Sequence, residues 1–144
     1  MNVREFSDTE KIKVDGAEFT LKVIDPKSFR KLSAKLSMAR TLLNGGKSGF
    51  SESDLEKAKL ESEERYLEAE EKLQEAFREF VRHGVSAHSG IKRKNGEDVP
   101  FKVGDDGLIS DETIALYDLQ RWILRLGNEV ITFNTLSEDE RKNS

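Results

Sequence analysis

The sequence predicts an α+β protein that is mainly helical, with an N-terminal β-hairpin, three helices and a small β-hairpin before the last helix. Apolar and polar residues alternate only near the N-terminus, whereas longer segments elsewhere carry apolar residues at helical spacing. An Asn-Gly pair, which favours a tight hairpin, lies between the second and third of these segments. The chain of 144 residues is about the size of one domain, which we expect to span residues 1–136.

The first hairpin centres on Asp15-Gly16, a pair that readily adopts the positive φ angles of a two-residue turn. Extended segments with a period of two flank it, so that one face of the hairpin is apolar. The apolar positions are Ile12, Val14, Phe19, Leu21 and Val23.

A first helix is expected after Asp25, which can cap it, with Pro26 at the first helical position. Asn44-Gly45-Gly46 ends it, because glycine readily adopts the left-handed conformation after a helix. The helix carries one apolar stripe, made of Phe29, Leu32, Leu36, Ala39 and Leu43.

A long second helix is expected over residues 52–83, with Ser51 or Ser53 opening a capping box and Gly84 ending it. Its first half is rich in charge and poor in apolar residues, which is typical of a solvated helix. Its second half should pack on the core through Leu73, Ala76, Phe77, Phe80 and Val81.

The second hairpin centres on Asn95-Gly96 within residues 91–101, and Pro100 restricts it to a short or edge ribbon. A last helix follows a cap at Ser110 or Asp111. Its apolar seam comprises Leu116, Leu119, Ile123, Leu126, Val130 and Phe133.

Gly127 and the β-prone run of residues 129–133 argue for a break and a strand inside this last segment. One continuous helix is favoured because six seam positions stay in register. We expect Leu116, Leu119, Ile123 and Leu126 to be buried against Phe77, Phe80 and the helix of Phe29, Leu32 and Leu36. Residues 137–144 carry no apolar side chain and are expected to form a flexible acidic and polar tail.

The composition argues against several classes of function. The net charge of −4 gives no general attraction to nucleic acid or to an anionic membrane. The absence of cysteine excludes thiol catalysis and fits a reducing compartment. No segment approaches the roughly 20 apolar residues of a membrane span, and the N-terminus has no signal-like apolar core. We therefore expect a cytoplasmic protein that contacts neither membrane nor nucleic acid.

No motif in the sequence predicts catalysis, a cofactor or a metal. Gly45-Gly46-Lys47-Ser48 resembles the end of a phosphate-binding loop but follows a helix where that motif requires a strand. His83 and His88 are five residues apart, which is not a helical ligand spacing, and surface histidines are the favoured interpretation. Lys92-Arg93-Lys94 is best explained as a solubilising edge. For Trp122, core packing is favoured over a role as an exposed partner anchor.

Three motifs in the second half resemble the tail assembly chaperones of long-tailed bacteriophages and related prophages. These are Phe80-Val81-Arg82-His83-Gly84-Val85, Asn95-Gly96-Glu97-Asp98-Val99-Pro100-Phe101, and the C-terminal Asn134-Thr135-Leu136-Ser137-Glu138-Asp139-Glu140-Arg141-Lys142-Asn143-Ser144. The resemblance covers about residues 77–144. It departs from the family pattern at Val85, where an aromatic residue is expected.

The resemblance implies a chaperone without enzymatic activity, acting in the host cell cytoplasm during phage assembly. It would bind the tape-measure protein, keep it soluble and help tail-tube protein polymerise around it. Self-association is compatible with this hypothesis. The residues expected to contact a partner are Trp122, Val130, Phe133 and Leu136.

Two alternatives stay open from the sequence. One is a small structural virion component, such as a head–tail or tail protein. The other is a small metal-dependent or nucleotide enzyme, for which the sequence offers almost no support.

Overall fold

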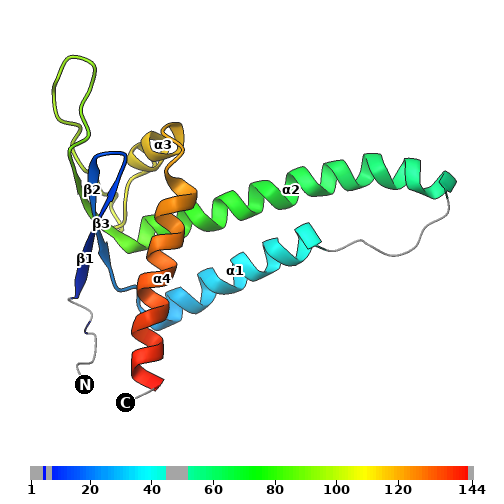
Figure 1. The fold of residues 1–144 in the computed structure, drawn as a ribbon, viewed down its shortest axis with the longest axis horizontal. Helices are drawn as coiled ribbons and strands as arrows, with labels where there is room; N and C mark the ends of the chain where they lie inside the picture. The colour runs from blue at the N-terminus through cyan, green and yellow to red at the C-terminus, as the bar shows by residue number, and fades with distance from the viewer. Residues whose placement is uncertain (1–4, 6–7, 45–51, 143–144) are drawn as a thin grey trace.

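The computed structural model describes residues 5, 8–44 and 52–142, with side chains described for residues 5, 8–43 and 63–135. Within these ranges it contains a three-stranded antiparallel sheet and four helices, so the predicted α+β, mainly helical class is confirmed (Figure 1). The expected helix end at Gly45-Gly46 and the possible cap at Ser51 lie outside the described residues. The sheet has the strand order β1-β2-β3.

The N-terminal hairpin forms as predicted. Strand β1 (Thr9–Val14) pairs with β2 (Ala17–Lys22), and Ile12 lies opposite Phe19. The turn residues Asp15 and Gly16 have φ angles of 50° and 85°, which is the conformation that this dipeptide favours.

A third strand, β3 (Val85–Ser89), directly follows a helix and was not predicted from the residue pattern. It pairs antiparallel with β2 on the side opposite β1, with a register irregularity between Thr20 and Leu21. Because β2 becomes the central strand, its inward-facing Phe19 and Leu21 are fully buried.

Helices α1 (Pro26–Asn44) and α2 (Glu52–Gly84) lie side by side and project away from the sheet as an arm (Figure 1). The Asp25 carboxylate accepts a hydrogen bond of 3.0 Å from the Ser28 N–H, which confirms the predicted cap of α1. As expected, α2 packs on the core through its second half, whose apolar residues Ala76, Phe77, Phe80 and Val81 are buried.

The prediction of one continuous last helix is wrong. The segment forms α3 (Asp111–Leu119) and α4 (Ile123–Lys142), and the chain turns at Arg121, whose φ is +63°. The turn is stabilised by hydrogen bonds from the Arg121 and Trp122 N–H groups to the carbonyls of Asp118 and Tyr117. The α3 cap is Ser110, whose hydroxyl accepts from the Thr113 N–H.

The break does not fall at Gly127, and residues 129–133 do not form a strand. Gly127 lies inside α4, where a Cβ would come within 2.5 Å of the Phe77 ring. Its glycine therefore permits close packing of α4 on α2 and does not end the helix.

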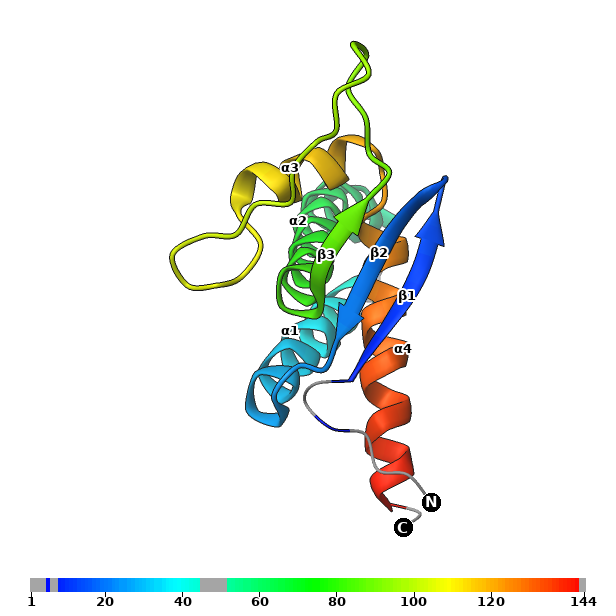
Figure 2. The same cartoon turned by 90° about the vertical axis from the view of Figure 1, so that its left-hand side faces the viewer.

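The change of direction at Arg121 also alters the predicted core. Ile123 and Leu126 are buried as expected and Leu116 is partly buried. The predicted burial of Leu119 is wrong, because this residue ends α3 and its side chain is 78% exposed. Figure 2 shows α1, α2 and α4 on one side of the sheet, where the core forms.

The predicted ribbon at residues 91–101 is present but forms no regular strands. A single bridge joins Lys92 to Asp98, and Gly96 in the turn has a φ of 88°. The Val99 N–H also donates to the Ile91 carbonyl at 2.9 Å, which closes the ribbon.

The C-terminal segment begins within helix α4, whose backbone continues to Lys142. Residues 143 and 144 lie outside the described residues. The flexibility of residues 137–144 stays a prediction.

Candidate protein-binding surfaces

Three of the four residues expected to contact a partner belong to the core. Trp122, Val130 and Phe133 are all buried, and none of them is presented to a partner in this conformation. The Leu136 side chain lies outside the described residues. The assignment of the first three to partner binding is therefore corrected to core packing, since the seam that they extend faces α2 and the sheet.

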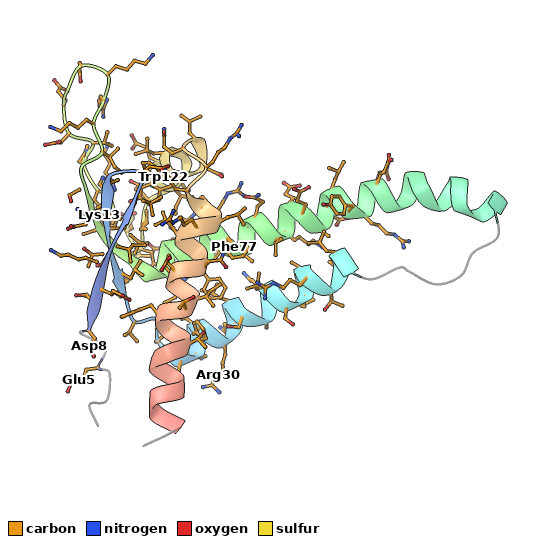
Figure 3. All side chains as sticks on the ribbon, viewed as in Figure 1. Glu5, Asp8, Lys13, Arg30, Phe77 and Trp122 are labelled. Carbon is orange, nitrogen blue, oxygen red and sulfur yellow. The ribbon has the colours of Figure 1, made fainter. Side chains whose placement is uncertain are left out.

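Trp122 fixes the α3–α4 junction to the first hairpin (Figure 3). Its indole N–H donates to the Asp15 carboxylate at 2.8 Å, and its ring packs edge-on against Phe19. A buried indole needs such an acceptor, and the Asp15-Gly16 turn supplies it. This contact joins residues that are 107 positions apart in the sequence.

His88 is a structural residue, and its predicted surface role is wrong. Its Nε2 lies 2.8 Å from the Val99 carbonyl, which can only accept, so Nε2 carries the proton. Its Nδ1 then accepts from the Tyr117 hydroxyl at 2.5 Å. Burial raises the pKa of Tyr117, which keeps this hydroxyl protonated. His88 thereby connects β3 to both the ribbon and α3.

His83 makes a weaker contact, with its Nε2 3.8 Å from the Glu79 carboxylate. Across the described part of the chain, no group of three or more His, Asp or Glu side chains is placed to hold a metal ion.

A groove of about 400 Å³ lies between the ribbon and α3, and we call it the ribbon–α3 groove. Leu119 opens onto it, with Leu116 and Ala115 on the same helix. The ribbon supplies Val99 and Pro100 on the opposite side. The remaining lining residues are polar or charged: Arg93, Lys102, Glu112 and Thr113.

Hydrogen bonds hold the two walls of this groove together. The Lys102 N–H donates to the Thr113 hydroxyl at 3.3 Å, and the Ser110 N–H donates to the Lys102 carbonyl at 3.0 Å. The Lys102 ammonium also pairs with the Glu112 carboxylate at 3.2 Å. The groove is therefore built into the fold, and it presents an apolar surface bordered by charge, as protein-binding sites commonly do.

A second groove, of about 350 Å³, lies between α1 and α2. Ala39 and Ala76 are its buried residues, and the exposed Met38 and Leu42 border it. Charged residues of both signs complete its lining: Lys35, Lys72, Glu75 and Glu79.

The heptad pattern did not predict the ribbon–α3 groove. Leu119 falls in register with the buried seam residues, so its spacing indicates burial. Its exposure becomes visible only once α3 is seen to end there. One residue did indicate an irregular backbone beside the groove: Pro100 in the ribbon, because proline disfavours a regular strand at that point.

Comparison of the chain with protein-family models, with curated proteins and with solved structures found no match. None of the described helices combines the length and the apolar character that crossing a bilayer requires. Fold and surfaces together define an α+β, mainly helical protein with two apolar grooves on its described surface.

Proposed function

We propose that this chain is an assembly chaperone of a long-tailed phage or prophage, which binds an apolar helical segment of the tape-measure protein in the ribbon–α3 groove. The observation that carries the proposal is the position of the family-like motif. Residues 95–101, which carry much of the resemblance, contribute Val99 and Pro100 to the groove opposite the exposed Leu119.

The groove has the chemistry that an amphipathic helix requires. Burying a leucine side chain completely contributes about 1.5–3 kcal/mol, and most of the Leu119 surface is still available for a partner. Arg93 on the border can pair with an acidic residue flanking the apolar face of the helix. Such binding covers apolar surface on the partner and needs no catalytic group, cofactor or metal.

In this proposal the protein acts in the host cell cytoplasm before the tail is complete. It keeps the tape-measure helices soluble until tail-tube protein polymerises around them. A chaperone of this kind leaves the tape-measure protein as assembly proceeds, whereas a structural virion component stays in the particle.

Co-expression with a tape-measure fragment tests the binding site. We expect Leu119→Asp to reduce the soluble yield of the fragment strongly, because it places a charge in the apolar part of the groove. Leu124→Asp is the matched control, since Leu124 is 45% exposed on α4 and does not line the groove. Circular dichroism of both variants establishes that each is folded.

Equal soluble yields with the two variants would refute binding in this groove. Mass spectrometry of purified phage particles tests the chaperone role separately. A chaperone should be absent from them, and a stoichiometric amount of the chain in the particle would favour the structural virion component instead.

A further inference from the structure

Charge is segregated between the two helices of the arm. Helix α1 contains five basic and no acidic residues, a net charge of +5. Helix α2 contains six basic and eleven acidic residues, a net charge of −5. Two helices of opposite charge therefore project side by side from one molecule whose net charge is only −4.

The basic residues of α1 form no ion pair with an acidic side chain in the described part of the chain. All five are exposed, and the one hydrogen bond found for the Arg30 side chain within the described residues goes to the Pro26 carbonyl. Among the side chains that the structure describes, no ion pair joins α1 to α2. The basic residues of α1 are Lys27, Arg30, Lys31, Lys35 and Arg40.

The acidic residues of α2 are also largely unpaired over its described length. Glu68 pairs with Lys72 at 3.4 Å within the helix, and Glu79 is close to Arg82 and His83. The other acidic residues from Glu63 onward are exposed and have no ion pair in the described part of the chain: Glu63, Glu64, Glu70, Glu71 and Glu75.

Each of these charged helices also exposes large apolar side chains. Met38 and Leu42, one helical turn apart, are at least half exposed on α1, as are Tyr66 and Leu67 on α2. Apolar side chains on a helix whose exposed charge is mainly of one sign fit a partner surface of the opposite charge.

We propose that a second copy of this chain is that partner, with the basic α1 of one copy packed against the acidic α2 of another. Each molecule carries both halves of the contact, so the charge on one copy matches the charge on the next. The exposed Met38 and Leu42 of α1 then meet Tyr66 and Leu67 of α2. This contact is separate from the ribbon–α3 groove and does not depend on the identity of the proposed tape-measure partner.

Sedimentation velocity of the full chain, at concentrations from about 1 to about 100 µM, tests the proposal. We expect oligomers in low salt that dissociate as salt rises towards 1 M, where the screening length falls to about 3 Å. Two variants reverse two side-chain charges on one helix each: Lys35→Glu with Arg40→Glu lowers α1 from +5 to +1, and Glu64→Lys with Glu71→Lys raises α2 from −5 to −1. We expect each to weaken association at least about tenfold, because the charge of one helix falls to +1 or −1 and the substituted side chains meet charges of their own sign.

Mixing the two variants is the decisive measurement. The first variant keeps the full charge of −5 on α2 but has only +1 on α1, whereas the second keeps +5 on α1 but has only −1 on α2. Each variant therefore loses most of its attraction to itself, while α2 of the first still matches α1 of the second. We expect mixed oligomers to form where neither variant alone associates. The control, Lys94→Glu with Arg125→Glu, changes two exposed charges outside the arm and should associate as the unmodified chain does.

Three outcomes would overturn the proposal: a monomeric unmodified chain at about 100 µM, association unaffected by either reversal, or no association in the mixture. Thermal melts monitored by circular dichroism establish that the variants are folded, so that lost association is not lost structure. A monomeric chain would leave the Leu119→Asp experiment unaffected, which keeps failure of this proposal distinct from failure of the proposed function.

Discussion

The crossing of α2 and α4 depends on Gly84, the last residue of α2. A Cβ at this position would lie 2.2 Å from Cγ1 and 2.9 Å from Cγ2 of Val130, which is fully buried and has no room to withdraw. Overpacking of this kind costs about 1–3 kcal/mol. Alanine regains less than about 1 kcal/mol of helix propensity, because the position ends the helix. We therefore expect Gly84→Ala to lower the free energy of unfolding by about 1–2 kcal/mol.

A double-mutant cycle with Val130→Ala separates this clash from other effects. Val130→Ala alone should cost about 1.5–3 kcal/mol, since it removes a buried side chain. In the double variant the new methyl group occupies space that Val130 has vacated. The combined loss should then be smaller than the sum of the single losses by about 1 kcal/mol or more.

Urea denaturation followed by circular dichroism and by Trp122 fluorescence measures all four free energies of unfolding. Additive losses, within about 0.5 kcal/mol, would show that the two positions are not in contact. An increase in stability from Gly84→Ala would refute the close crossing altogether.

Leu126→Ala should lower the free energy of unfolding by about 2–5 kcal/mol, because Leu126 is fully buried. Leu119→Ala should change it by less than about 0.5 kcal/mol, because Leu119 is exposed. Urea denaturation measures both losses, and equal losses would contradict the assigned exposures. Tyr117→Phe should cost about 1–3 kcal/mol at neutral pH because His88 Nδ1 loses its donor. Burial raises the pKa of Tyr117, so the stability that its protonated hydroxyl contributes is present below pH about 10 and is lost as the pH rises further. The Tyr117→Phe variant should therefore lose less stability in alkali than the unmodified chain. Identical stability profiles of the two proteins in alkali would contradict this prediction. The hydrogen bond from the Ser28 N–H lowers the pKa of Asp25 below 3.8, so the stability that the ionised carboxylate contributes is present above that pH and is lost below it. On acid titration, Asp25→Ala should lose stability less steeply than the unmodified chain. Equal losses of stability in acid for the two proteins would refute the cap.

Partner-binding residues were harder to predict than core residues. The spacing of apolar residues identifies a face of a helix but does not say whether that face meets the core or a partner. Val130 and Phe133 are in the seam and are buried, whereas Leu119 is in the same seam and is exposed. The difference arises from the turn at Arg121, which rotates α3 relative to α4.

The sequence by itself determined the features that depend on short-range chemistry. The Asp15-Gly16 turn, the Asp25 cap and the packing half of α2 follow from turn preference, capping and helical periodicity, each encoded within a few residues. The charge segregation of the arm is likewise present in the sequence, once the bounds of α1 and α2 are known.

The tertiary structure alone decided the features that depend on distant residues. Strand β3 exists because β2 offers it a free edge, although its own sequence lacks clear alternation. The last helix divides where Trp122 reaches the Asp15 carboxylate, a contact that no local pattern encodes. Gly127 stays helical because α4 packs closely on Phe77, and this burial offsets the cost of glycine within a helix. At each of these points a long-range contact outweighs a local preference of about 1 kcal/mol, which is why the local pattern did not predict the outcome.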